Sequence, residues 1–172
     1  MDNDSALWLT AEELRTFRAF NRSWRALDAR LDRDLQRAMN MPRTYFEILW
    51  RLRRAPERAL RMSELAEATD SKASRITHAV GKLEQAGLIR REVAAEDRRG
   101  WVAILTDEGL RVVEQAAPRY ADGIRENFLD RLTPAMRKEL TRIGELLIAS
   151  LEPEDASAAS EKQEDSAAAD LP

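Results

Sequence analysis

The chain of 172 residues contains no cysteine and only one histidine. Without cysteine it cannot form a disulfide bond, hold zinc through thiolates or sense oxidants through a thiol. A single histidine also argues against a histidine-based metal centre. We therefore expect no metal site and no cofactor.

Long apolar segments are missing as well. No run approaches the roughly 18 apolar residues that a membrane-spanning helix needs. The first residues, MDNDSALWLT, lack the basic and apolar parts of a signal peptide. The sequence therefore predicts a cytoplasmic protein with no membrane partner.

Motifs of catalysis are also lacking. The sequence has no P-loop, no glycine-rich nucleotide loop, no HExxH segment and no Ser-His-Asp spacing. We therefore expect no catalytic residues and no enzymatic activity.

What the chain does have is charge, and this charge is unevenly distributed. The net charge is −3, yet residues 43–105 carry 13 basic and 9 acidic side chains, whereas residues 152–172 carry 1 basic and 7 acidic ones. A basic central segment favours an anionic partner such as DNA. The acidic end, rich in Ala and Ser, is predicted to be disordered. It is either a solubilising tail or a competitor of DNA for the basic segment.

Apolar residues at helical spacing dominate the remainder of the chain. The segment TAEE (10–13) is a capping box that begins a long helix. Apolar residues then recur in steps of three and four from Leu14 to Ala38, and Asn40 and Pro42 end the pattern. No short helix can cover a helix of about seven turns, so we expect it to pack across subunits as well as within one.

The central segment predicts two short helices and one longer one. Residues 43–54 form the first, and Ser63 caps the second. Residues 72–86 form the third, which ends at the cap glycine Gly87.

Two short strands follow, and they predict a β-hairpin. Residues 88–93 and 101–106 flank the charged loop EDRRG, and Thr106 caps the next helix. Helices followed by a hairpin in this order are typical of a winged helix-turn-helix. The predicted fold class is mainly α with a small β-hairpin wing.

The helix over 72–86 has two different faces. Ile76, Val80 and Leu83 lie on a side suited to burial, whereas the other side carries hydroxyl and basic groups suited to base edges and phosphates. A solvated basic face is the plain alternative, which the short helix and basic hairpin beside it disfavour. The residues assigned to DNA contact here are Ser71, Lys72, Ser74, Arg75, Thr77, His78 and Lys82.

These segments resemble the MarR family of bacterial transcription regulators. The likeness is carried by SKASRITHAVGKLEQAGLIRR (71–91) and EDRRGWVAILTDEG (96–109), and it extends over about residues 7–150. The family's wing signature is Asp-x-Arg followed by Leu-Thr-x-x-Gly. Here it reads Asp97, Arg99, Leu105, Thr106 and Gly109.

The resemblance implies a homodimer that binds double-stranded DNA. Residues 1–42 and 106–151 are then a helical dimerisation region, residues 43–105 the winged helix-turn-helix domain, and residues 152–172 a disordered acidic tail. Each recognition helix would enter a major groove and each wing a minor groove, which predicts an inverted-repeat operator with half-sites about 10 bp apart. Because members of the family usually repress by blocking polymerase, we expect a repressor.

The wing residues receive separate roles. Arg98 and Arg99 are assigned to the minor groove, where narrow A·T-rich stretches attract arginine, and Asp97 to supporting the wing by accepting a hydrogen bond from an arginine. An ordinary surface ion pair is the alternative for this pair of charges. Trp101 is predicted to pack on the inner side of the wing, because a paired duplex offers no free base face for stacking.

The resemblance also implies a small phenolic or lipophilic effector, bound between the dimer core and the winged domain. Aromatic residues can line such a pocket, although each candidate is equally well explained as a core residue. The candidates are Phe20, Trp24, Tyr45, Phe46, Trp50 and Tyr120.

A winged helix that binds a protein instead of DNA is the alternative function. It would place apolar residues on the exposed face of the 72–86 helix, but that face carries Lys, Arg, His, Ser and Thr. The sequence therefore predicts a dimeric, sequence-specific DNA-binding regulator.

Overall fold

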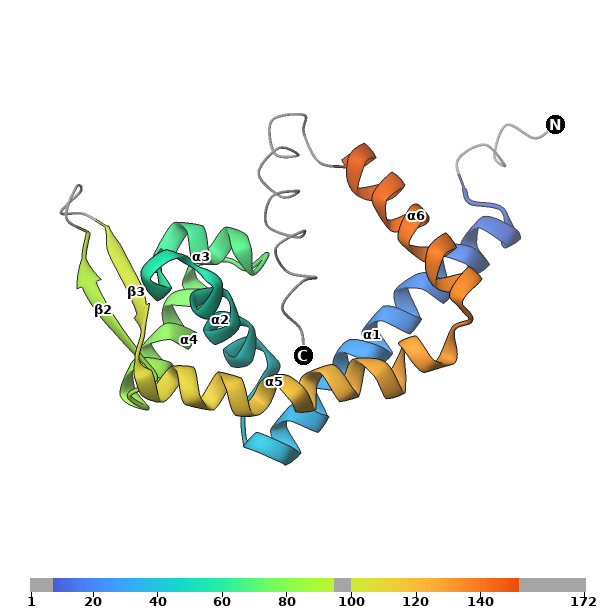
Figure 1. Cartoon of the computed structure of the whole chain (residues 1–172). Coiled ribbons are helices and arrows are strands. Elements are labelled where there is room, and N and C mark those ends of the chain that lie inside the picture. The colour runs from blue at the N-terminus through green and yellow to red at the C-terminus, as the bar shows by residue number, and fades with distance from the viewer. Residues whose placement is uncertain (1–7, 95–99, 152–172) are drawn as a thin grey trace. The chain divides into compact units, whose positions relative to one another are not determined.

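The computed structural model describes residues 8–94 and 100–151 (Figure 1). These residues form a mainly helical fold with one small antiparallel sheet, which confirms the predicted fold class. Two single 3-10 turns, Pro56–Arg58 and Leu129–Arg131, connect some of the elements. The elements are α1 (Ala11–Met39), α2 (Arg43–Arg54), β1 (Ala59–Arg61), α3 (Met62–Ala68), α4 (Ala73–Gln85), β2 (Ile89–Val93), β3 (Trp101–Leu105), α5 (Asp107–Asn127) and α6 (Pro134–Leu151).

The described residues divide into two compact units, one ending at Val113 and the other beginning at Glu114. The first unit therefore contains α1, the central helices, the sheet and the start of α5. The second contains the remainder of α5 and α6, where the hydroxyl oxygen of Thr133 accepts the backbone N–H of Met136 and caps α6. Among the described helices none is long and apolar enough to span a membrane.

Both predicted ends of α1 are confirmed. The Thr10 hydroxyl accepts the backbone N–H of Glu13 at 3.2 Å, and the Glu13 carboxylate accepts the backbone N–H of Thr10 at 2.7 Å. Hydrogen bonding of the Glu13 carboxylate to the Thr10 backbone N–H, and secondarily to the Thr10 side chain, lowers the pKa of Glu13. At the other end Asn40 adopts the left-handed conformation that closes many helices, with φ of 50°.

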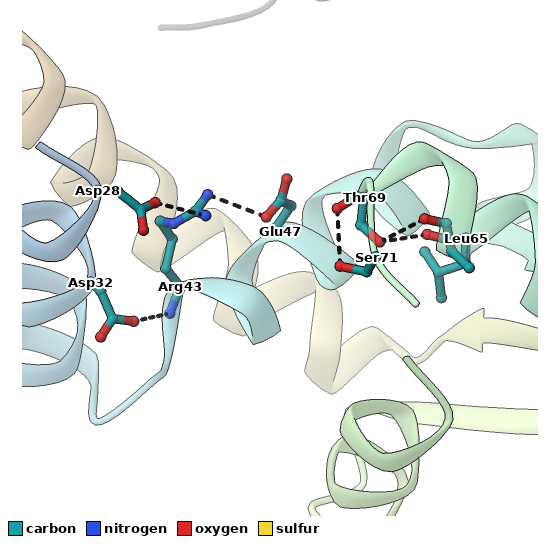
Figure 2. Close-up of polar contacts among 8 residues, drawn as sticks. Asp28, Asp32, Arg43, Glu47, Leu65, Thr69 and Ser71 are labelled. Atoms are coloured by element: carbon teal, nitrogen blue, oxygen red, sulfur yellow. Dashed lines mark hydrogen bonds and ion pairs between the residues drawn. The ribbon is translucent and has the colours of Figure 1, made fainter. Parts of the chain in front are cut away.

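The start of α2 is fixed by acidic residues of α1 (Figure 2). Pro42 precedes α2 and offers no side-chain cap. Asp32 supplies the missing acceptor, because its carboxylate takes the backbone N–H of Arg43 at 2.8 Å. The Arg43 guanidinium in turn binds Asp28 at 2.8 Å and Glu47 at 3.2 Å. A carboxylate at a helix N-terminus also interacts favourably with the helix dipole, so α1 and α2 are joined electrostatically.

A continuous apolar core joins α2, α3, α4 and the sheet. It is formed by one face of each helix together with the inward residues of β2 and β3, as the periodicity predicted. Figure 1 shows these helices gathered beside the two long strands. The least exposed side chains of this core are Ile48, Leu49, Leu52, Leu65, Ile76, Val80, Leu83, Ile89 and Ala103. Because α4 packs through a single face, its other face is left exposed.

The sheet has one strand more than predicted. Its order is β1-β3-β2, and all neighbours are antiparallel. The additional strand, β1, is the three-residue segment ALR, which is too short to show a period of two. It forms because β3 offers it a partner, with Ala59 opposite Ile104 and Arg61 opposite Val102.

The predicted cap of the third helix is wrong by two residues. Ser63 lies inside α3, and Arg61 is the capping residue. Arg61 ends β1 and is therefore already extended, so the helix begins at the residue that follows it. Glu64 then accepts the backbone N–H of Arg61 at 2.8 Å, as the residue at the third helical position does in a capping box.

Candidate nucleic-acid interface

A compact turn positions α4 after α3. The buried Thr69 hydroxyl donates to the carbonyl oxygen of Leu65 at 2.7 Å, and the Ser71 hydroxyl donates to the carbonyl oxygen of Thr69 at 3.1 Å (Figure 2). The backbone N–H of Ser71 donates to Ala66 at 2.9 Å, and Asp70 takes a left-handed conformation between them. Of the residues assigned to DNA contact, Ser71 is thus half-buried and takes part in the turn.

The remaining assigned residues of α4 are brought together on its exposed face. Within residues 8–94 and 100–151, Lys72, Arg75 and Lys82 have no carboxylate partner. Thr77 is exposed but donates its hydroxyl to the carbonyl oxygen of Ala73 at 2.9 Å. The exposed residues of this set are Lys72, Ser74, Arg75, Thr77, His78 and Lys82. We call these six residues the cationic face of α4.

The N-terminus of α4 is open to an anion. Lys72 is the capping residue and makes no side-chain cap hydrogen bond. The first backbone N–H groups of a helix have no partner within the helix and carry a partial positive charge. Together with the cationic face, this end of α4 has the chemistry needed to bind a phosphate.

The wing strands are closed at their outer end by one more hydrogen bond. The backbone N–H of Ala94 donates to the carbonyl oxygen of Gly100 at 2.9 Å. The predicted wing residues Asp97, Arg98 and Arg99 lie outside the described residues. The structure therefore describes the base of the wing, which consists of β2, β3 and this closing hydrogen bond.

Gly87 joins the end of α4 to the wing. It has φ of +74°, a conformation that glycine adopts without strain. The backbone N–H of Leu88 donates to Leu83 at 3.0 Å and that of Gly87 donates to Glu84 at 2.9 Å. These two bonds are the Schellman motif that the sequence predicted.

The Leu-Thr-x-x-Gly part of the wing signature locks the other end of the wing. The Thr106 hydroxyl donates to the Gly87 carbonyl oxygen at 2.8 Å and accepts the backbone N–H of Gly109 at 3.0 Å. Gly109 lies so close to the turn after α4 that a Cβ atom there would be 2.1 Å from the Leu88 carbonyl oxygen. This part of the signature is therefore structural, since it ties α5 to the end of α4.

One ion pair at the base of the wing was not predicted from the sequence. The Arg91 guanidinium, on β2, donates through Nε to the Glu84 carboxylate of α4 at 2.9 Å and donates again through Nη2. Hydrogen bonding to Arg91 is the main cause of the lowered pKa of Glu84, and the same bond raises the pKa of Arg91. The sequence feature that could have indicated this ion pair is two opposite charges seven residues apart, one on each side of the cap glycine Gly87.

Stability should depend on pH through this pair. Because the folded-state pKa of Glu84 lies below its ordinary value of 4.5, the pair stabilises the fold fully above that value and is lost as pH falls through the lowered pKa. We expect the melting temperature of wild type to exceed that of Glu84→Gln at pH 7, and the difference to be smaller at pH 3. A difference that is the same at both pH values would show that the carboxylate charge does not matter.

Trp101 lies on the inner face of the wing, as predicted. By alternation along β3 it shares this face with the buried residues Ala103 and Leu105. It is nevertheless 50% exposed, because it lies at the outer end of the strand, and the Arg91 guanidinium carbon is 5.7 Å from the centre of its ring. Trp101 is thus a strand residue that stacks with an arginine.

The aromatic residues considered for an effector pocket lie in different environments. Phe46 is buried on α2 and stacks on the half-buried Trp50 with ring centroids 5.9 Å apart. Phe20 and Trp24 are exposed on α1, Tyr45 is half-buried, and Tyr120 belongs to the second unit. Among the six candidates, Phe46 and Trp50 are the pair with a described ring contact. No group of three or more potential metal ligands is present among the described residues.

Sequence comparisons point to one family. The model of the MarR family matches residues 39–100. The curated regulator PecS of Dickeya dadantii, an HTH-type transcriptional regulator, is 36% identical over 104 residues. That alignment covers 59% of this chain and 60% of PecS, so it spans less than two thirds of that relative.

Structural comparisons cover more of the chain. Sco3205 of Streptomyces coelicolor, a MarR family transcriptional regulator crystallised in complex with DNA, has a TM-score of 0.80 and 42% identity, covering 86% of this chain and 96% of that protein. AbsC of the same organism, also a MarR family transcriptional regulator, has a TM-score of 0.78 and 35% identity, covering 84% and 97%.

Proposed function

The chain belongs to the MarR family of transcriptional regulators, which are not enzymes, and we propose that it is a dimeric repressor that binds a pseudo-palindromic operator in duplex DNA. The observation that carries this proposal is the cationic face of α4, whose basic side chains have no carboxylate partner among the described residues. The crystal structure of the similar protein Sco3205 in complex with DNA supports the same proposal.

Each part of the winged helix-turn-helix receives a role. The N-terminus of α4 and the cationic face would enter the major groove, where Arg and Lys bind guanine or phosphate and His78 binds phosphate. Ser71 would contribute to the same surface while it holds the turn. Arg98 and Arg99 would reach the minor groove, with Asp97 supporting them.

Exposed apolar side chains support a homodimer. Phe17, Phe20 and Trp24 on α1 are between 57% and 58% exposed, although they continue the same helical face as the buried Leu31 and Leu35. On α6, Met136, Ile143 and Leu147 are also exposed. Apolar rows of this kind are typical of surfaces that a second subunit covers. Residues 1–42 and 106–151 would thus provide the dimer and residues 43–105 the DNA-binding domain.

We further propose that a small lipophilic or phenolic effector releases the repressor from DNA. The half-buried ring of Trp50, stacked on Phe46 and approached by the Arg53 guanidinium at 5.3 Å, is the best supported of the candidate contacts. A panel of phenolic compounds, added to the protein–operator complex, tests this part. Release by a member of the panel, lost in Trp50→Ala, would support it.

A winged helix that binds a protein is the second candidate function. It would need large apolar groups on the exposed side of α4. The exposed positions of this helix instead carry Lys, Arg, His, Ser and Thr, while Ile76, Val80 and Leu83 are buried. Duplex DNA is therefore the better partner for this surface.

Selection of bound sequences from a random duplex pool tests the proposed function. We expect an inverted repeat with half-sites about 10 bp apart, because a two-fold symmetric dimer presents two recognition helices about one turn of DNA apart. Enrichment of a single unrepeated site would contradict the dimeric mode, and no enrichment would contradict sequence-specific binding.

Replacing Arg99 tests the proposed role of the wing. Arg99→Ala should weaken binding to the selected operator about tenfold, since an arginine in a narrow minor groove contributes about 1–2 kcal/mol. Its melting temperature should stay close to that of wild type, because surface substitutions usually change stability by less than about 0.5 kcal/mol. An affinity near that of wild type at moderate salt would reject the role.

The acidic segment 152–172 lies outside the described residues, and we propose that it acts mainly as a solubilising tail. Deleting residues 152–172 distinguishes a solubilising tail from a tail that competes with DNA for the basic segment. A solubilising tail predicts unchanged non-specific DNA affinity at low salt, whereas competition predicts a rise.

A further inference from the structure

We propose that Glu84, Arg91 and Trp101 form a strut that fixes the wing hairpin at a set angle to the recognition helix α4. These three are positioning residues: they would act on DNA binding through the wing rather than by touching DNA. The effect on DNA rests on the proposed function, whereas the mechanical effect on the wing does not.

The first contact of the strut joins α4 to β2. Arg91 donates to the Glu84 carboxylate from its backbone N–H at 3.2 Å and from its side-chain Nε at 2.9 Å, with Nη2 as a further donor. Both carboxylate oxygens are used. Charge-assisted bonds of this paired kind are directional as well as strong, so one carboxylate on α4 holds both the backbone and the side chain of a wing residue.

The location of Glu84 explains why it requires a cation. Glu84 lies in the last turn of α4, where the partial negative charge of the helix C-terminus disfavours a carboxylate. Arg91 offsets this local repulsion. The two side chains are 35% and 30% exposed, so the pair is less screened by water than a fully exposed one.

The second contact joins β2 to β3 on the same face. Arg91 is opposite Ala103, whose small side chain is fully buried, and Val93 is opposite Trp101. Arg91 and Trp101 are therefore diagonal neighbours, which long and aromatic side chains can bridge. The distance of 5.7 Å between the guanidinium carbon and the ring centre falls within the range of cation–π interactions.

The outer end of the wing needs this support. β1 pairs with β3 over Val102–Ile104, so Trp101 lies beyond the three-stranded part of the sheet. There the wing is a two-stranded ribbon, and its inner residues Val93 and Trp101 are about half exposed. Two-stranded ribbons are marginally stable on their own and twist readily. The strut would restrict this motion, because it links Trp101, the outermost inner side chain of β3, to α4 through Arg91.

Hydrogen exchange of the free full-length protein tests the strut without DNA. In Glu84→Gln we expect the backbone amides of Ala94 and Val102, which lie in hydrogen-bonded pairs of the wing, to exchange about tenfold faster than in wild type, while the amides of Leu49 and Ile76 keep their protection. Trp101→Leu should reproduce this pattern. Glu139→Gln is the matched control, because it breaks a comparable paired bond between Glu139 and Arg142 on α6, and it should leave the wing amides unchanged. Unchanged exchange at the wing, or an equal rise throughout the protein, would overturn the proposal.

A double-mutant comparison then tests the consequence for DNA. Glu84→Gln should weaken binding to the selected operator about fivefold in the wild-type background and less than about twofold in the Arg99→Ala background, since the strut acts through the wing. Exchanging the two charges, with Glu84→Arg and Arg91→Glu together, should recover part of the loss, because it restores the ion pair but not the contact with Trp101. An equal loss of affinity in both backgrounds would show that Glu84 does not affect DNA binding through the wing. If wild type itself binds no duplex, the proposed function fails. The hydrogen-exchange measurement on the free protein still decides whether the strut exists.

Discussion

Gly109→Ala is expected to lower the free energy of unfolding by about 3 kcal/mol. Helix propensity alone predicts the opposite sign, since alanine normally stabilises a helix interior by about 1 kcal/mol relative to glycine. The structure favours destabilisation. A Cβ atom at this position would lie 2.1 Å from the Leu88 carbonyl oxygen and 2.7 Å from a methyl group of Leu105.

Neither of these neighbours can move easily. The Leu88 carbonyl oxygen accepts the backbone N–H of Thr106 at 3.1 Å, and the Leu88 N–H completes the Schellman motif of α4. Leu105 is only 4% exposed and belongs to the core. Relief of the clash would therefore displace α5 from the turn and break the Thr106 cap, which adds about 1 kcal/mol to the cost.

Equilibrium unfolding by urea measures this effect. Gly81→Ala is the matched control, because Gly81 also lies in a helix, α4, and an added Cβ meets nothing within 4 Å. It should be neutral or stabilise the protein by up to about 1 kcal/mol. Similar stabilities for the Gly109 and Gly81 variants would contradict the assignment of Gly109 as a close-contact position.

Replacing Lys72, Arg75 and Lys82 together with alanine is expected to weaken operator binding at least about 100-fold at moderate salt. Each side chain contributes about 1–2 kcal/mol through a phosphate or a guanine edge. All three are exposed and lack carboxylate partners among the described residues, so the fold gains little from them. The melting temperature should change only slightly.

Fluorescence anisotropy with the selected operator measures this loss. Arg119→Ala with Lys138→Ala is the control, because both side chains are exposed and belong to the second unit. It removes two positive charges that do not belong to the cationic face of α4 and should change affinity no more than about threefold. Equal losses in the two variants would mean that overall charge, rather than the cationic face of α4, governs binding.

Helix ends could be predicted from the sequence because their signals are local. Thr10 with Glu13 predicted the start of α1, Gly87 predicted the end of α4, and Thr106 predicted the start of α5. In each case a side chain or a glycine satisfies backbone groups within a few residues along the chain. At these three ends, capping therefore needs no knowledge of the tertiary fold.

Features that depend on distant partners could not be predicted. The strand β1 exists because β3 offers it hydrogen bonds, and the cap of α3 moves from Ser63 to Arg61 as a result. The Asp32 cap of α2 likewise comes from a different helix, eleven residues earlier in the chain. In these places a tertiary contact overrides the local preference.

The features of the candidate site also fall into local ones, which the sequence predicts, and ones that depend on distant partners. The cationic face of α4 followed from helical periodicity, which already separates Ile76 and Val80 from Arg75 and His78. The contact of Arg91 with both Glu84 and Trp101 did not follow, because it depends on the turn at Gly87 and on the register of β2 against β3. A sequence shows which charges are present, but the turn decides which of them meet.

The salt dependence of binding to duplex DNA tests the central claim most directly. The full-length chain is titrated with the selected operator over a series of salt concentrations, and the logarithm of the association constant is plotted against the logarithm of the salt concentration. A dimer that contacts about six phosphates through its cationic faces and helix N-termini predicts a slope of about −5. A slope near zero, or the absence of binding to any duplex even at low salt, would contradict the assignment of α4 as a DNA-recognition helix.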